Sequence, residues 1–154
     1  MGMTSLADNL AIQNAMPYEE RDLPVTVYDM LAGTTAKFPS HNAISFQLTS
    51  GPTDKAETLT WKELHDKTCQ AANLFRSLGV EEGDVVALVL PNCNETAIAI
   101  LGGMVAGIVN PINPLLDAEQ ISSILRETNA KVVVTLKSFP QSDVAQKTAK
   151  AVDF

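Results

Sequence analysis

Six consecutive apolar residues, Val85–Leu90, constrain the fold of this chain more than any other feature. A run of this kind, without alternating polar side chains, is typical of a strand buried on both faces of a parallel sheet. Shorter apolar runs follow at Ile108–Asn110 and Lys131–Thr135, and helical segments separate the three runs. The order of strand, helix, strand, helix, strand predicts an α/β fold. We expect a doubly wound, mainly parallel sheet with helices on both faces.

Capping residues indicate where the helices begin and end. Thr60 and Glu63 have the spacing of a capping box, and Gly79 is placed as the left-handed C-cap of the same helix. The apolar face expected for that helix comprises Trp61, Leu64, Thr68, Ala71, Phe75 and Leu78. Further helices are expected at about 27–38, 95–106, 117–129 and 142–152. Pro111–Pro114 predicts a rigid loop directly after the strand at 108–110.

The first part of the chain has a different pattern. Residues 1–24 show no sustained apolar period and predict a loosely attached entry segment, with the α/β subdomain over residues 25–154. Ala43–Thr49 alternates in polarity, as a strand with one buried face does. The polar stretch 50–55 predicts a turn and Thr58–Thr60 a returning strand, so we expect a hairpin here.

Charge and apolar runs exclude several classes of function. With 11 Lys+Arg against 18 Asp+Glu and a net charge of -7, the chain lacks the cations that broad nucleic-acid binding needs. The longest uncharged apolar stretch, Ala97–Val109, is shorter than the roughly 20 residues of a membrane span. Gly103 and Gly107 in this stretch have the spacing that can mark helix dimers in membranes, but in so short a run we expect them to let a buried helix approach the sheet closely. No secretory signal pattern is visible and only two cysteines are present, so we expect a cytoplasmic protein without a disulfide framework.

The residues that usually carry chemistry do not form a recognisable constellation. Neither a G-x-G-x-x-G nor a G-x-x-x-x-G-K-[ST] phosphate loop is present. His41 and His65 are expected at the surface or at a boundary. Cys93 follows the buried strand and lies near a helix N-terminus, where a thiolate is favoured and where α/β sheets bind ligands. No base or acid partner for it can be identified, so we assign no catalytic, cofactor-binding or metal-binding residue.

Four segments, in order along the chain, resemble motifs of one enzyme family. Leu59–Leu64 resembles the first core motif of the adenylate-forming, AMP-binding acyl-CoA synthetases, a Leu-Thr/Ser-aromatic-x-Glu-Leu signature. Gly79–Leu88 is similar to the Gly-Val…Gly-Asp-x-Val-Ala passage that follows it, and Leu101–Pro114 resembles the second core motif. The expected helix and strand over Glu119–Thr135 also fit. The resemblance covers about residues 25–136, and the Asn-Pro-x-Asn-Pro form is typical of fatty-acyl (long-chain-like) and related CoA ligases.

The resemblance implies a ligase of fatty acid metabolism that converts a small carboxylic acid, ATP and coenzyme A into acyl-CoA, AMP and pyrophosphate. In that family the phosphate-binding loop, the Mg²⁺-binding acid and the catalytic lysine lie downstream of the matched region. We therefore expect this chain to be an N-terminal fragment, truncated before the catalytic motifs and inactive alone. Its partner would be the remainder of the enzyme chain, with no nucleic acid and no membrane span, and it would form a homo-oligomer. Glu63 and the asparagine-proline loop match motifs regarded as structural, so no site residue is transferred.

Two other functions remain open from the residues. One is a free-standing, non-catalytic α/β module that binds a protein or a small ligand. The other is a small flavodoxin-like or nucleotide-binding enzyme, which the missing glycine loop disfavours. The coding sequence after Phe154 discriminates between fragment and free-standing module, because only a fragment is followed by a Ser/Thr/Gly-rich phosphate loop.

Overall fold

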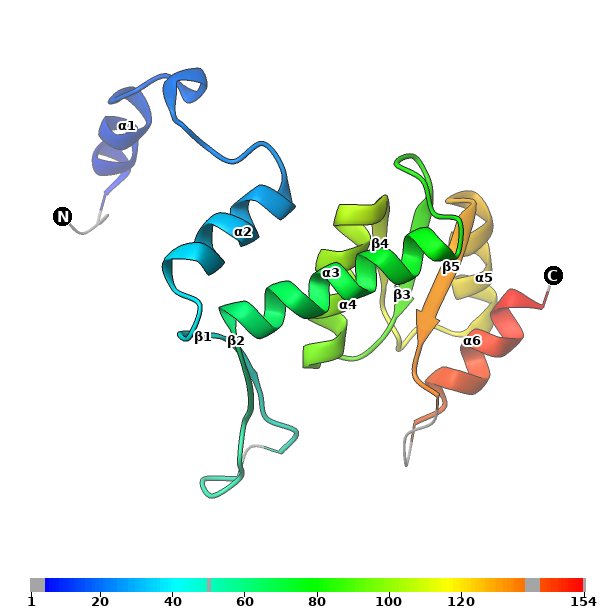
Figure 1. The fold of residues 1–154 in the computed structure, drawn as a ribbon. Helices are drawn as coiled ribbons and strands as arrows, with labels where there is room; N and C mark the ends of the chain where they lie inside the picture. Colours follow the sequence, from blue (N-terminus) through cyan, green and yellow to red (C-terminus); the bar gives the residue numbers. More distant parts are fainter. Residues whose placement is uncertain (1–4, 50, 138–141, 154) are drawn as a thin grey trace.

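A three-stranded parallel sheet forms the centre of the molecule, with a separate two-stranded hairpin beside it (Figure 1). The computed structural model describes residues 5–49, 51–137 and 142–153. The described helices are α1 (Leu6–Asn14), the 3₁₀ turn η1 (Tyr18–Glu20), α2 (Val27–Lys37), α3 (Trp61–Ser77), α4 (Asn94–Ala106), α5 (Ala118–Glu127) and α6 (Val144–Val152). The strands are β1 (Asn42–Phe46), β2 (Glu57–Thr60), β3 (Val85–Val89), β4 (Ile108–Ile112) and β5 (Ala130–Thr135). The parallel sheet has the order β4-β3-β5.

The central strand β3 divides its side chains between two hydrophobic cores. Val86 and Leu88 face a core that α3 and α4 close, whereas Ala87 and Val89 face a core that α5 and α6 close. All four side chains are almost completely buried. Helices therefore cover both faces of the sheet, which confirms the doubly wound α/β fold predicted from the apolar run.

The strand β4 is longer than predicted. The rigid loop expected from Pro111 begins only after Ile112, because β4 continues in parallel register with β3 up to Ile112 opposite Val89. Proline lacks the N–H that a central strand must donate, but β4 lies at the edge of the sheet, where this donor is dispensable. Pro111 can therefore stand within β4 because this strand lies at the edge of the described sheet.

The helix α3 begins and ends as its capping residues predict. The Thr60 backbone N–H donates to Glu63 Oε2 at 2.8 Å, and the Glu63 N–H donates to Thr60 Oγ1 at 3.3 Å. The first of these bonds holds the pKa of Glu63 below its usual value. Gly79 follows the helix with φ +86°, in the left-handed region. On the buried face, Ala72 replaces the expected Leu78, which is exposed.

Two adjacent glycines let α4 pack closely on both of its sides. A Cβ at Gly102 would come within 2.6 Å of Ala71 Cβ and 3.1 Å of the Thr68 carbonyl oxygen, both on α3. A Cβ at Gly103 would overlap Val109 on β4. The expected close approach of this helix to the sheet is confirmed at Gly103, and Gly102 adds a close crossing with α3 that was not predicted.

The hairpin is also present, with shorter strands than expected. β1 and β2 pair antiparallel, and β1 ends at Phe46 and not at Thr49. Asp54 closes the turn, where its carboxylate accepts from the Gly51 N–H at 3.0 Å and contacts the Thr49 hydroxyl. Ser50 lies outside the described residues.

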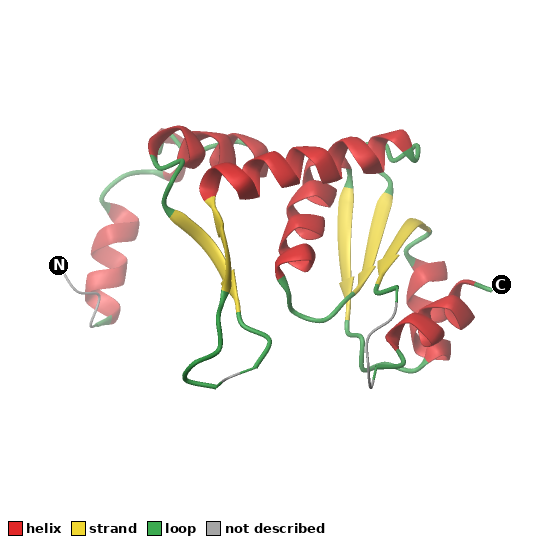
Figure 2. Cartoon of the chain, turned by 60° about the horizontal axis from the view of Figure 1, so that its bottom comes forward, coloured by secondary structure: helices red, strands yellow, loops and turns green. Residues whose placement is uncertain are grey.

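The entry segment contains a helix that the sequence pattern did not reveal. α1 is capped by Ser5 and Asp8 in a capping box, and none of its residues is buried. The Arg21 guanidinium donates to the carbonyl oxygens of Gln13 and Met16 at the end of this helix. Both views show α1 set apart from the sheet and its covering helices (Figures 1 and 2).

Candidate functional site

A cavity of about 680 Å³ lies where β3 and β5 end, between the hairpin and the parallel sheet. Ligands of open α/β sheets bind at this carboxyl edge of the strands. Much of the lining is apolar and comes from segments far apart in the chain, including Phe46 and Leu48 from the hairpin region and Leu136 after β5. The rest of the described lining is Lys55, Glu57, Pro91, Asn92, Cys93, Glu95, Ser142 and Val144.

Cys93 lines this cavity, as its place in the sequence predicted. It is the N-cap residue of α4, and its Sγ lies 3.2 Å from Thr96 Oγ1. The Thr96 hydroxyl donates to the Pro91 carbonyl oxygen at 2.5 Å. Since that bond uses the only hydroxyl hydrogen, the thiol must act as the donor to Thr96. No histidine belongs to the described part of the cavity lining, so Cys93 has no visible general base.

Asn94, the first residue of α4, joins the hairpin to the sheet. Its side chain is 2% exposed, and its Nδ2 donates to the Glu57 carbonyl oxygen at 3.0 Å. Its Oδ1 is buried and has no hydrogen-bond partner. The role of Asn94 was not predicted from the sequence. The polar triplet Asn92-Cys93-Asn94 directly after a buried strand was the available signal.

The two histidines lie elsewhere, His41 at the surface and His65 at a boundary, as expected. The ring of His65 stacks at a tilt on Tyr28, with 5.6 Å between the centroids, and lies 3.9 Å from Cys69 Sγ and 3.7 Å from Asp66 Oδ1. The hydrogen bond from Lys62 holds the pKa of Asp66 below its usual value. This contact group lies on the surface of α3, outside the cavity. His41 packs against Phe38 in the loop before β1.

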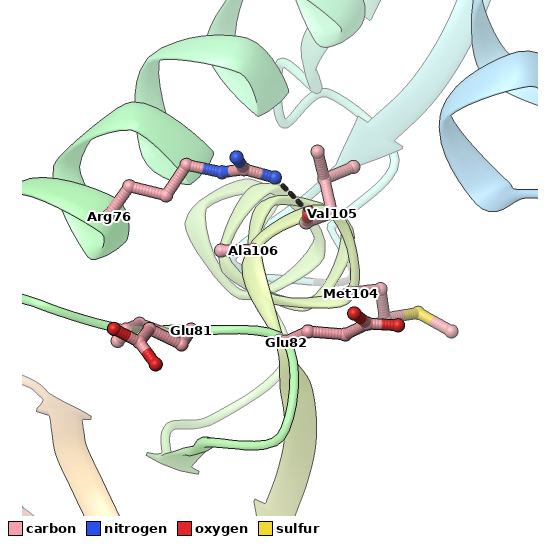
Figure 3. A pocket seen from close by; sticks show the side chains of 8 residues that line it. Arg76, Glu81, Glu82, Met104, Val105 and Ala106 are labelled. Atoms are coloured by element: carbon pink, nitrogen blue, oxygen red, sulfur yellow. Dashed lines mark hydrogen bonds between the residues drawn. The ribbon is translucent and has the colours of Figure 1, made fainter.

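A second cavity, of about 480 Å³, lies at the opposite end of α4 (Figure 3). The Arg76 guanidinium reaches across from α3 and donates to the Val105 carbonyl oxygen at 3.0 Å. This bond satisfies a carbonyl that the helix end leaves free, and it places positive charge at the negative end of the helix. Glu81 and Glu82 also line this cavity (Figure 3). The arrangement stabilises the α3–α4 pair and holds no nucleophile.

The turn before β3 is held by an ion pair across the sheet. Lys131 Nζ on β5 lies 2.6 Å from Asp84 Oδ2, which also accepts from the Glu81 backbone N–H at 2.7 Å. The Lys131 hydrogen bond, followed by the Glu81 bond, holds the pKa of Asp84 below its usual value. This pairing fixes the amino ends of the strands, away from the candidate site.

The cavity at the carboxyl edge does not fit the groups that the resemblance implies. Its charged side chains are Lys55, Glu57 and Glu95, an acidic balance that disfavours a triphosphate. Within residues 5–49, 51–137 and 142–153, no cluster of three or more His, Cys, Asp or Glu side chains has the geometry to hold a metal ion. We therefore derive no step through ATP or Mg²⁺ from these residues.

Comparison with known proteins identifies the family. The family model of the AMP-binding enzymes matches residues 31–153, which is most of the chain. The chain belongs to the AMP-binding enzyme family. The resemblance inferred from the four sequence motifs is thereby confirmed.

Relatives of this AMP-binding chain include CoA ligases of different substrate classes. A long-chain-fatty-acid–CoA ligase of Bacillus subtilis is 31% identical over 144 residues, covering 91% of this chain and 24% of the relative. A marinolic acid–CoA ligase of Pseudoalteromonas is 34% identical over 120 residues, covering 78% of this chain and 18% of the relative. The chain thus spans about a fifth to a quarter of the length of these relatives.

Solved structures agree on the fold. The fatty acyl CoA synthetase of Mycobacterium tuberculosis superposes with a TM-score of 0.61 at 28% identity, over 71% of this chain and 21% of the other. A benzoate CoA ligase of Burkholderia xenovorans gives a TM-score of 0.68 at 20% identity, over 83% and 24%. The latter likeness concerns the fold alone. Over the described residues of this AMP-binding chain, we find no helix with the length and apolar character needed to cross a bilayer.

Proposed function

We propose that this chain is the amino-terminal α/β unit of an acyl-activating ligase. The whole enzyme would join a carboxylic acid to ATP, release pyrophosphate, and transfer the acyl group to coenzyme A. The observation that carries the proposal is the family match over residues 31–153, together with CoA ligase relatives of which the matched region covers only 18% and 24%. The remainder of that enzyme would be the main partner of this unit.

In this proposal the chain supplies a scaffold and performs no adenylation alone. Acyl-adenylate formation requires donors placed around a triphosphate and a cation over the developing charge. Removing a single donor of this kind typically raises the barrier by about 3–4 kcal/mol. Lys55 is the one cation in the described cavity lining, and two glutamates accompany it. The lining does not offer these donors.

An ATP–pyrophosphate exchange assay tests this proposal. Residues 1–154 are measured beside the longest product encoded by the same gene, with a panel of carboxylic acids from acetate to long-chain fatty acids and with benzoate. We expect exchange from the longer product and only background from residues 1–154. Exchange by residues 1–154 would refute the scaffold role, and inactivity of a longer product on every acid would refute the ligase assignment.

The panel also tests the substrate class. The Asn-Pro-x-Asn-Pro motif and the long-chain-fatty-acid–CoA ligase relative support a fatty acid as the substrate. We therefore expect exchange to increase with acyl chain length. A cytoplasmic location belongs to the same proposal, and it is checked by separating soluble and membrane fractions of cells that express the gene.

A second candidate function is supported by the cavity of about 680 Å³, which is apolar over much of its described lining. A free-standing module would use such a cavity to bind a small apolar ligand. A thermal-shift screen with short fatty acids and their alcohols separates the two proposals. Leu48→Lys, at the rim of this cavity, should abolish any true shift, whereas Leu115→Lys, at an exposed leucine in the loop after β4 that does not line the cavity, should leave it unchanged.

A further inference from the structure

Two side chains of types that bind transition metals lie one turn apart on α3. His65 and Cys69 have the spacing i, i+4, which places both of them on the same face of the helix. Cys69 is a free thiol, and both ring nitrogens of His65 lie near its Sγ, Nε2 at 3.9 Å and Nδ1 at 4.0 Å. Both residues are half-buried, so solvent reaches the pair. An imidazole and a thiol in this arrangement can act as a chelating pair.

The separation of the two donor atoms suits an ion of the zinc type. Zn²⁺ binds an imidazole nitrogen at about 2.0–2.1 Å and a thiolate sulfur at about 2.3 Å, in tetrahedral geometry. Two such donors on one ion are therefore about 3.6 Å apart. The distance of 3.9 Å between His65 Nε2 and Cys69 Sγ has to close by only about 0.3 Å. A change of this size lies within the reach of side-chain rotation, so the helix backbone need not move.

Neighbouring groups orient the His65 ring for this role. Its Nδ1 lies 3.7 Å from Asp66 Oδ1, while the ion pair of Asp66 with Lys62 uses the other carboxylate oxygen, Oδ2. From α2, the ring of Tyr28 stacks on the imidazole with 5.6 Å between the centroids. A histidine whose Nδ1–H faces a carboxylate keeps the lone pair of Nε2 for a metal. Asp66 therefore favours the tautomer in which Nε2 faces the ion.

We propose that His65 and Cys69 form a binding site for a borderline-soft divalent ion of the Zn²⁺, Co²⁺ or Cd²⁺ type. Thiolate and imidazole select such ions over Mg²⁺, which prefers oxygen ligands. Binding displaces the thiol proton to solvent. Within the described residues no group of three His, Cys, Asp or Glu side chains can hold a metal, so water takes the remaining positions on the ion.

The bound ion would join two successive turns of α3 and fix the His65 ring against Tyr28 of α2. Every contributing side chain belongs to α2 or α3, so the site does not depend on any segment outside these two helices. It lies apart from the cavity at the carboxyl edge of the sheet, and it is independent of the proposed ligase activity.

Titration with Co²⁺ followed by absorption spectroscopy tests the proposal, because a cobalt–thiolate bond gives an intense charge-transfer band in the near ultraviolet. We expect one equivalent of Co²⁺ to produce the band, Zn²⁺ to displace it, and an excess of Mg²⁺ to leave it unchanged. Cys69→Ser should abolish the band, and His65→Gln and Asp66→Asn should each weaken Co²⁺ binding by about tenfold or more. Cys93→Ser and His41→Gln are the matched controls and should behave as the native chain. No band, or a band that persists in Cys69→Ser, would overturn the proposal.

Alkylation of the native chain gives a second readout that needs no variant. Zn²⁺ should slow the reaction of Cys69 with iodoacetamide by about tenfold or more, because a metal-bound thiolate is a poorer nucleophile, and it should leave the rate at Cys93 unchanged. Mass spectrometry of the two cysteine peptides measures both rates, in residues 1–154 and in the longest product of the same gene. Equal protection of the two cysteines, or no protection of Cys69 in the longer product, would count against the site.

Discussion

A methyl group added at Gly102 should separate α3 from α4. In the native packing the new Cβ would come within 2.6 Å of Ala71 Cβ, 3.1 Å of the Ala72 nitrogen and 3.1 Å of the Thr68 carbonyl oxygen. Two of these atoms belong to the backbone, so a side-chain rotation cannot relieve the overlap. The two helices must move apart, and side chains in the core between α3, α4 and β3 must then lose contacts.

The magnitude follows from two opposing effects. Overpacking of a close helix crossing costs about 2–3 kcal/mol when the backbone must shift, and replacing a helical glycine by alanine returns about 1 kcal/mol. We expect Gly102→Ala to lower the free energy of unfolding by about 1–2 kcal/mol. Gly33→Ala on α2 is the matched control, since nothing lies within 4 Å of its added Cβ. That variant should stabilise the chain by about 0.5–1 kcal/mol.

Urea denaturation followed by far-ultraviolet circular dichroism measures both variants. The measurement is made at a low protein concentration, so that association does not contribute to stability. The two variants should move the midpoint in opposite directions. A Gly102→Ala chain as stable as the Gly33→Ala chain would refute the close crossing as described.

Three further perturbations follow from the hydrogen bonds. Thr60→Ala removes the α3 cap and should cost about 1 kcal/mol in urea unfolding, whereas Thr60→Ser should cost little. Arg76→Ala frees the Val105 carbonyl and should cost about 1 kcal/mol by the same measurement; an unchanged midpoint would show that the bond contributes nothing. Because the pKa of Asp84 is lowered in the folded state, its contribution is present above the usual carboxyl pKa of about 4 and is lost as the pH falls through the lower, folded value. Asp84→Asn should therefore reduce the loss of stability between neutral and acidic pH, and an unaltered pH profile would contradict this.

The sheet could be predicted because its information is local. The run Val85–Leu90 has no polar side chain, and only a strand covered on both faces buries such a run completely. The capping box of Thr60 and Glu63 is equally local, since both partners lie within one helical turn. In these places the preference of the segment and the tertiary fold agree.

The sequence predictions were wrong where the structure of a segment depends on residues far away in the chain. Pro111 predicts a loop by itself, but its place at the edge of the sheet lets the strand continue to Ile112. The run Lys131–Thr135 has the composition of a central strand, yet only β3 pairs with it in the described part of the chain, and residues 132–135 are half-buried while Lys131 is exposed. The helix α1 was missed for the opposite reason, since it packs on no core and therefore needs no apolar period.

The candidate site was predictable only in part. The position of Cys93 beyond a buried strand follows from topology and is confirmed. The cavity around it also needs Phe46 and Leu136, which lie on either side of it in sequence and meet it only in the folded chain. The apolar pattern around Phe46 or around Leu136 does not indicate that these residues line a cavity with Cys93.

The division of β3 between two cores makes the sheet a single cooperative unit. Each of its residues supports one helical layer while its backbone holds both neighbouring strands. Strain introduced on the α3–α4 side cannot be relieved locally, because any shift of β3 also moves Ala87 and Val89 against α5 and α6. The two layers should therefore open together, so that amides in α5 exchange with solvent at the same free energy as those in α4.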